Sequence, residues 1–241
     1  MPSSTGSGAS CHDGRDALPL APLLRGVWRG QTVYRRWMEL VMAEAPVSGR
    51  VLDLGGGGSG LVRVGGRVER VIVVDIRHQV RPDVVADLER PLPFADQSVD
   101  CVVCLNVLEH LRDDRVVIRE SARVLRANGM LVLCVPFLYP VHTASHPEFF
   151  VHDFRRYTER LWSELLLGEG GFRSVRTRAC GTGPFMAAVN LLVTEVKFRP
   201  VKVVMAAAGA LLDRVHGRLA ARRASIARTA WPIGYYIEAV R

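Results

Sequence analysis

Acidic residues and glycines follow two apolar runs in a pattern typical of a nucleotide-binding turn. Asp53 lies near the end of the first run, and three glycines follow it at Gly55, Gly57 and Gly60. Glycine lets the chain turn sharply and lets a ligand approach the backbone closely. Asp75 ends the second run, where an acid accepts hydrogen bonds from ribose hydroxyls. NAD and S-adenosylmethionine both contain an adenosine ribose, so these residues alone indicate a nucleotide-type ligand of either kind.

Cysteines offer a second candidate chemistry, because Cys101 and Cys104 form a CxxC pair. Such a pair can serve redox or metal chemistry. Both residues lie inside an apolar run, however, and an odd spacing on a strand sends two side chains to opposite faces. We therefore expect small core side chains there. The chain has five cysteines, and an odd number favours free thiols in a reducing cytoplasm.

The apolar runs alternate with helical patterns. We expect strands at 50–54, 71–75, 83–87, 99–105, 130–136, 173–180 and 233–240. We expect helices at 23–45, 113–127 and 158–167, with Gly129 at the C′ position of the second. The third should turn inward Leu161, Trp162, Leu165 and Leu166. Strands that are nearly continuous in Val, Leu and Ile indicate a parallel sheet with helices on both faces.

Several spaced motifs between residues 50 and 172 resemble those of the class I S-adenosylmethionine-dependent methyltransferases, in particular the branch called methyltransferase type 11. They are Val51–Gly57, Asp75, Ala86–Leu88 followed by Pro91–Phe94, Asn106–Leu111 and Arg123–Gly129. The resemblance implies an α/β fold with a Rossmann-like, seven-stranded, mostly parallel sheet. It also implies that the last strand is antiparallel to the others and that helices cover both faces.

The resemblance assigns S-adenosylmethionine as the cofactor and gives roles to three acids. Asp53 would hold the amino group of the cofactor, Asp75 the ribose and Asp87 the adenine amino group. The predicted cofactor site is completed by Gly55, Gly57, Leu88 and Asn106. Each acid also has a purely structural interpretation, such as capping a turn, and for Asp87 the two interpretations are evenly balanced.

One residue departs from the family pattern near the cofactor. Ser59 stands where the family commonly has a further glycine, so we expect binding to survive but the methionine end of the cofactor to be held differently. Glu109 and His110 are shared by family members with different acceptors. We therefore expect this pair to support the cofactor side first, with His110 as a second candidate for catalysis.

The segment after the fifth strand, 136–158, resembles a lid in methyltransferases encoded with surface-glycan and natural-product pathways. A hydroxyl acceptor must lose its proton, and a histidine suits that step. His142 is the first candidate base, although it could equally hydrogen-bond within the lid. We expect Asp153 and Arg156 to form a structural pair. We expect no metal at His142, His146 and His152, because Pro147 interrupts any helix that would align them.

The chain is basic, with a formal charge of +8 and a pI near 9.8. No basic stripe interleaved with aromatic residues is present, so nucleic acid is an unlikely partner. Residues 1–20 are expected to be a flexible tail, with no apolar signal-peptide core. We expect a cytoplasmic protein with a methyltransferase domain at 21–181 and 231–241.

Residues 182–230 are expected to form a helical insertion before the last strand. Its first part is apolar, and 214–228 is basic and amphipathic. Arg214, Arg218, Arg222 and Arg223 share a helical face. A cap over the active site is the first interpretation. The alternative is peripheral association with the anionic inner face of a membrane, or capture of a lipid-linked acceptor.

These features predict methyl transfer from S-adenosylmethionine to a hydroxyl or carboxyl of a glycan, lipid-linked precursor or secondary metabolite. A nicotinamide-dependent oxidoreductase would also explain the glycines, but no catalytic tyrosine–lysine pairing is apparent and the motif Asn106–Leu111 would go unexplained. A non-catalytic binding protein of the same fold is disfavoured by the acids at Asp53, Asp75 and Asp87. The sequence does not identify the acceptor atom or the oligomeric state.

Overall fold

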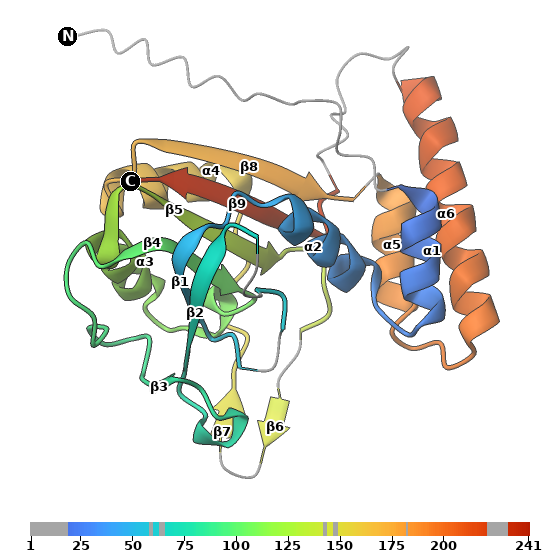
Figure 1. Cartoon of the computed structure of the whole chain (residues 1–241). Coiled ribbons are helices and arrows are strands. Elements are labelled where there is room, and N and C mark those ends of the chain that lie inside the picture. Colours follow the sequence, from blue (N-terminus) through green and yellow to red (C-terminus); the bar gives the residue numbers. More distant parts are fainter. Residues whose placement is uncertain are drawn as a thin grey trace, which may run out of the picture.

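Seven strands form one sheet in the order β3-β2-β1-β4-β5-β9-β8 (Figure 1). The computed structural model describes residues 19–57, 60–62, 66–141, 144–146, 149–181, 183–220 and 231–241. The strands of this sheet are β1 (Gly49–Leu54), β2 (Val68–Asp75), β3 (Val84–Val85), β4 (Val99–Leu105), β5 (Leu125–Pro136), β8 (Ser174–Cys180) and β9 (Gly234–Val240). A separate antiparallel pair consists of β6 (Ala144–His146) and β7 (Phe149–Val151).

The strand directions confirm the predicted fold class. Strands β3, β2, β1, β4 and β5 pair in parallel, whereas β9 runs antiparallel to both of its neighbours, β5 and β8. The carboxyl ends of β1 and β2 therefore meet at one edge of the sheet. There the N–H of Gly55 donates to the carbonyl oxygen of Val74 at 2.7 Å, which brings the two predicted acids to the same edge.

Helices cover both faces of the sheet. On one face α2 (Val33–Glu44) packs with a core that includes Val51 and Cys101. On the other face α3 (Asp114–Val124), α4 (Glu159–Ser163) and a wider helical turn η3 (Glu164–Glu169) pack with Leu52 and Cys104. Cys101 and Cys104 thus lie on opposite faces, and the four described cysteines are buried free thiols. The prediction of core cysteines is confirmed for these residues, while Cys11 lies outside the described part.

The single helix expected at 23–45 is wrong, because the chain forms two helices. They are α1 (Leu20–Trp28) and α2. Gly30 between them has a φ of +94°, which glycine adopts without steric cost. Thr32 then begins α2, since its side chain accepts the N–H of Arg35 at 3.0 Å.

The expected boundaries of α3 and β5 also need correction. The helix ends at Val124, and Leu125 is already fully buried in β5, where it pairs with Val99 of β4. The left-handed residue is Asn128, with φ +64°, and not Gly129. A short polar side chain tolerates this conformation.

Two smaller expectations are wrong as well. The strand expected at 83–87 is only Val84–Val85, because the Asp83 side chain turns to accept the N–H of Val73 at 2.8 Å. In α4 the side chain of Leu161 is 37% exposed, whereas Trp162, Leu165 and Leu166 are buried as expected.

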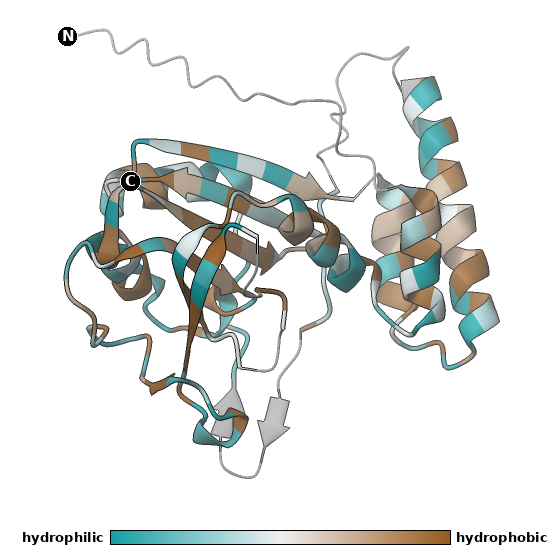
Figure 2. Cartoon of the chain, in the orientation of Figure 1, coloured by the Kyte–Doolittle hydropathy of each residue, from teal (hydrophilic) through white to brown (hydrophobic). Residues whose placement is uncertain are grey.

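The segment before β9 contains α5 (Pro184–Leu192) and α6 (Arg199–Ala220). Helix α6 packs with both α5 and α1, the latter from the beginning of the chain, beside the sheet (Figure 1). Asp213 is buried in this group and accepts the N–H groups of Phe185 and Met186, both at 3.0 Å, which caps the start of α5. Figure 2 shows many apolar residues along α5 and α6. Among the described residues, no helix combines the length and apolar character needed to cross a membrane.

Candidate active site

Asp53 lies at the carboxyl end of β1 with its carboxyl group in the interior. It is 3% exposed, and its Oδ1 atom has no hydrogen-bond partner among the described residues. The following turn packs directly on it, because a Cβ atom added to Gly56 would lie 2.1 Å from the Asp53 carboxyl carbon. Burial, and then the charge of Asp75, raise the pKa of Asp53 to about 7. A buried carboxyl of this kind is suited to a cationic group supplied by a ligand.

Asp75 at the end of β2 is buried and tied to the same turn. Its Oδ2 accepts the N–H of Gly57 at 3.2 Å. Arg77 donates from its backbone N and from Nε to Oδ1, both at 2.9 Å, and from Nη2 to Oδ2 at 2.8 Å. Burial acts to raise the pKa of Asp75, but the side-chain and backbone hydrogen bonds from Arg77 outweigh it and lower the pKa. Asp75 is therefore ionised and positioned.

Arg77 is a site residue that the sequence interpretation missed. Besides Asp75, its Nη2 also donates to the carbonyl oxygen of Gly57 at 3.2 Å. The guanidinium thus links the glycine turn to the end of β2. Its position two residues after Asp75 was visible in the sequence. No spacing rule, however, distinguishes an arginine that binds Asp75 and the glycine turn from one that is exposed to solvent.

Asp87 and Leu88 lie in a turn in which the Asp87 carboxyl group finds its partners within the turn. Oδ1 of Asp87 accepts the N–H of Glu89 at 2.9 Å, and Oδ2 lies 3.5 Å from Nε of Arg90. Leu88 is buried in the core on the α3 side of the sheet. These contacts account for Asp87 as a turn residue, and its contact with adenine stays a prediction.

Asn106 lies next to the glycine turn, and its side chain contacts α2. It has a φ of +55°, and its Oδ1 accepts the hydroxyl of Tyr34 at 2.8 Å. The adjacent Val107 fills the space beside the turn, since a Cβ atom on Gly55 would lie 2.4 Å from its Cγ2. Tyr34 is a second residue missed from the sequence. Burial raises its pKa well above the ordinary value, so it stays a neutral donor.

Glu109 and His110 follow β4 in a single helical turn η2 (Leu108–His110). Glu109 is fully buried, and neither carboxyl oxygen has a hydrogen-bond partner among the described residues. Burial is the main cause that raises its pKa to about 8. Nδ1 of His110 lies 2.8 Å from the carbonyl oxygen of His152, which can only accept, so this nitrogen carries a proton. Nε2 then faces Oε1 of Glu109 at 3.7 Å.

The lid segment is anchored to the sheet through residues that follow β4. The N–H of Phe154 donates to the carbonyl oxygen of Glu109 at 2.8 Å. Asp153 and Arg156 form the predicted pair, in which Nη1 and Nη2 of the arginine each donate to one carboxyl oxygen. The lid is thus held next to Glu109 and His110, and it was expected from the sequence to lie over this edge.

A second anchor joins the lid to the start of α3. Buried Tyr157 donates its hydroxyl to Oδ2 of Asp114 at 2.7 Å and lies 3.0 Å from the carbonyl oxygen of Leu108. Nη1 of Arg155 donates to Oδ1 of the same Asp114 at 2.7 Å. The ring of Tyr157 also stacks on that of Trp162, with centroids 4.4 Å apart. Together these contacts fix residues 153–157.

Comparison with known proteins shows what part of this chain is similar to. Residues 52–133 match the family described as "Methyltransferase domain". Two Mycobacterium tuberculosis proteins, from strains CDC 1551 and H37Rv, carry the name "Probable S-adenosylmethionine-dependent methyltransferase". Each is 36% identical over 118 residues, which is 45% of this chain and 41% of the relative. The chain therefore spans less than half the length of these curated relatives.

Two solved structures share the fold. One comes from the complex between the Haloferax volcanii Trm112 methyltransferase activator and "the putative methyltransferase", with a TM-score of 0.53, 19% identity and coverage of 92% of this chain and 96% of that chain. The other is Haemonchus contortus phosphoethanolamine N-methyltransferase 2 in complex with S-adenosyl-L-methionine, with a TM-score of 0.52, 13% identity and coverage of 84% and 52%. At these identities the likeness concerns the fold. Residues 52–133 are thus similar to a methyltransferase domain, and the chain has the fold of these solved structures.

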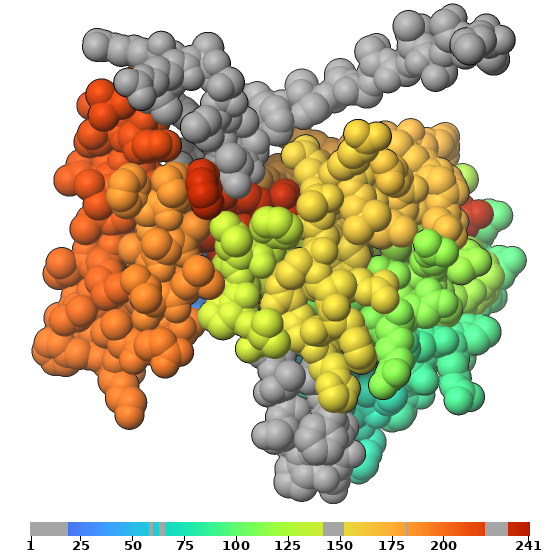
Figure 3. Space-filling model, turned by 180° about the vertical axis from the view of Figure 1, so that it is seen from behind, coloured from blue at the N-terminus to red at the C-terminus, as the bar shows by residue number. Residues whose placement is uncertain are grey.

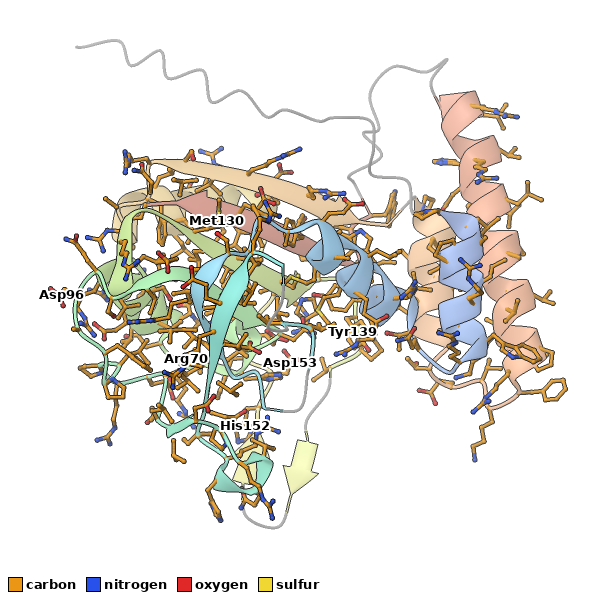
Figure 4. All side chains as sticks on the ribbon, viewed as in Figure 1. Arg70, Asp96, Met130, Tyr139, His152 and Asp153 are labelled. Carbon is orange, nitrogen blue, oxygen red and sulfur yellow. The ribbon has the colours of Figure 1, made fainter. Side chains whose placement is uncertain are left out.

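The matched segment runs from β1 into β5 and contains the predicted cofactor residues and the Glu109–His110 pair. The lid, α1, α2, α5 and α6 lie outside the match. Figure 4 shows Tyr139, His152 and Asp153 on the side of the domain where β5 ends, away from Met130 and Asp96. Tyr139 also contacts Tyr34, with ring centroids 5.6 Å apart.

The first candidate base, His142, lies outside the described residues, so its role stays a prediction. His146 belongs to β6, and only its backbone is described, paired with Phe149. Within the described residues, no group of three or more metal-ligating side chains occurs. Of the two candidate bases, only His110 can therefore be located, and it lies beside the buried Glu109.

Proposed function

We propose that this chain transfers a methyl group from S-adenosylmethionine to an oxygen of a small acceptor. One observation carries the proposal: the buried Asp53 carboxyl has an unpartnered Oδ1 atom among the described residues and lies under a glycine turn that is tied to Asp75. The matched family and the names of the relatives support the same cofactor.

The residues present fit this cofactor. Asp53 would receive the positively charged amino group, and Asp75 the ribose hydroxyls next to the clasp formed by Arg77. Side chains in the turn at Gly55–Gly57 would collide with Val107, Asp53 or Val80, so the turn requires glycine. A turn without side chains would also let the cofactor approach the backbone closely. Asp87 and Leu88 would border the adenine, and Asn106 would hold the turn in place through Tyr34. When bound, the cofactor supplies an activated methyl group on a sulfonium.

On the acceptor side, the chain has to orient an oxygen nucleophile and remove its proton. Positioning is the larger contribution in an in-line displacement. His110 and His142 are the candidate bases. The Nε2 atom of His110 has a lone pair when Nδ1 carries the proton, so the His110–Glu109 pair can hold and release one proton. The acceptor class that we propose is a hydroxyl or carboxyl of a glycan, lipid-linked precursor or secondary metabolite. We propose a cytoplasmic location, peripheral to the inner face of the membrane.

Thermal unfolding in the presence of candidate cofactors tests the proposal. A ligand that binds only the native state stabilises it by about 2.7 kcal/mol at a hundredfold excess over Kd. We expect S-adenosylmethionine and S-adenosylhomocysteine to raise the melting temperature and NADH to leave it unchanged. Asp75→Ala should weaken S-adenosylhomocysteine binding by about tenfold, because a hydrogen bond to a charged group contributes about 1.5–3 kcal/mol. A shift with NADH and none with S-adenosylmethionine would support an oxidoreductase instead.

A further inference from the structure

Helix α6 presents a row of apolar side chains to solvent. Six side chains between 43% and 67% exposed form what we call the α6 stripe: Val201, Val204, Leu211, Leu212, Val215 and Leu219. Their spacing places them along one side of the helix. The opposite side is used for packing, since Ala206, Ala210 and Asp213 are buried. The side chains of the α6 stripe therefore do not contribute to the hydrophobic core of the protein.

The extent of the α6 stripe distinguishes it from ordinary surface apolar residues. Single exposed apolar side chains need no explanation, whereas a contiguous row indicates an interaction surface. The helix has 22 residues, which corresponds to a length of about 33 Å. Figure 3 shows α5 and α6, in orange, forming one side of the molecule. The stripe thus offers an extended linear contact on an outer element.

Most of the exposed charged residues around the α6 stripe are basic, and the exposed acid nearest to the beginning of α6 is Glu195. Arg214 and Arg218 are exposed on the same helix, and Lys197 and Arg199 are exposed at its beginning. The acid of α6, Asp213, is buried and engaged with the start of α5. Within residues 199–219, which the structure describes, no acidic side chain is exposed. A partner that covers the stripe must therefore tolerate, or supply a counter-charge for, a border with more exposed cations than acids.

We propose that the α6 stripe docks α6 lengthwise on an anionic lipid bilayer, with the apolar side chains in the interface and the arginines among the head groups. This combination of an apolar row and basic neighbours is what interfacial helices use, and each basic residue contributes up to about 1 kcal/mol near an anionic surface. The long arginine side chains can extend to the head groups while their stems cover apolar surface. This docking surface would account for the peripheral membrane location proposed above, and it does not depend on methyl transfer.

A second copy of the chain fits the α6 stripe less well. In a symmetric contact between two α6 helices, Arg214 and Arg218 would meet the same cations of the partner, with no exposed acid on described α6 to pair with them. An anionic bilayer supplies that counter-charge. The surface also differs from the one expected from the sequence, which consisted of Arg214, Arg218 and also Arg222 and Arg223. Those two arginines lie outside the described residues, whereas the α6 stripe rests on described side chains.

Co-sedimentation of the full chain with vesicles, without cofactor, tests this surface. With vesicles of equal parts phosphatidylcholine and phosphatidylglycerol at low salt, we expect the protein to pellet. We expect weaker binding at high salt and with phosphatidylcholine alone. Leu211→Glu combined with Val204→Glu should reduce binding at least tenfold. Leu211→Ser with Val204→Ser should also reduce it, because this pair removes apolar area without adding charge.

The matched control is Val85→Glu, which adds a charge at a side chain 58% exposed on β3, outside the α6 stripe. This variant should bind vesicles like the wild type. Absence of pelleting at low salt, or pelleting that the four stripe substitutions leave unchanged, overturns the proposal. A dimer in sedimentation equilibrium that the stripe substitutions dissociate, without vesicle binding, also overturns it in favour of a second copy. S-adenosylhomocysteine binding measured on the same samples tests the proposed function independently of vesicle binding.

Discussion

Asp53 and Glu109 are buried carboxyls at the carboxyl edge of the sheet, on β1 and just after β4. Neither Oδ1 of Asp53 nor either oxygen of Glu109 has a hydrogen-bond partner among the described residues. Burial raises the pKa of Asp53 to about 7 and that of Glu109 to about 8. A buried polar group without a partner destabilises the folded state. Two such groups at one edge mark a functional site, because active sites are where this kind of destabilisation is retained.

The raised pKa of Glu109 makes a prediction about stability. An ordinary glutamate titrates near 4.5, so the unfolded chain releases this proton at a lower pH than the folded chain does. The contribution of Glu109 to stability is therefore fully present below pH 4.5 and is lost as the pH rises through about 8. Glu109→Gln removes this loss. We expect urea unfolding to find the variant more stable than the wild type at pH 8, with a smaller difference at pH 5.

The same substitution should reduce turnover if the His110–Glu109 pair handles the proton of the acceptor. Loss of a general base lowers kcat by about 10²–10⁴, and Glu109→Gln, which removes only the partner of His110, should lower kcat by up to this factor while cofactor affinity stays near the wild-type value. The exposed Glu69→Gln is the matched control and should change neither property. A Glu109→Gln variant that is less stable than the wild type at pH 8 would contradict the assignment of a buried, protonated carboxyl.

At the scale of elements, strands were predicted better than their connections. Runs rich in Val, Leu and Ile indicated β1, β2, β4 and β5, because strands in the middle of a covered sheet leave a simple apolar pattern. The boundary between α3 and β5 was not predictable in the same way. Leu125 fits an apolar helical face as well as a strand, and its pairing with Val99 decides the matter. Long-range pairing of this kind is not encoded in local propensity.

The lid anchor at Tyr157 belongs to this scale. Its hydroxyl joins the lid to both η2 and α3, through Leu108 and Asp114. Tyr157→Phe keeps the ring stacked on Trp162 but leaves one buried oxygen of Asp114 without this donor. We expect the free energy of unfolding to fall by about 1–3 kcal/mol in urea titrations. An unchanged stability would show that the hydroxyl contacts do not hold the lid.

At the scale of the whole molecule, the cofactor side was predictable from the sequence and the acceptor side was not. Asp53, Asp75 and the glycines follow spacing rules that arise from ribose and backbone chemistry. Arg77 and Tyr34 join the site through contacts made only after folding, and no spacing rule points to either residue. Similarly, the basic charge of the chain could be read from the sequence. Which side of α6 is exposed could not, because it depends on the packing of α1 and α5 against the other side of the helix.

The pH dependence of S-adenosylhomocysteine binding, measured by isothermal titration calorimetry, tests the central claim that Asp53 holds the amino group of the cofactor. With a pKa of about 7, Asp53 is mostly protonated at pH 6 and mostly ionised at pH 8. The ammonium group prefers the ionised form, so affinity should be about tenfold weaker at pH 6 than at pH 8. Glu109→Gln should keep this dependence, and Asp53→Asn should abolish it together with most of the affinity. Affinity that is independent of pH in the wild type, or equally dependent on pH in Asp53→Asn, would contradict the account.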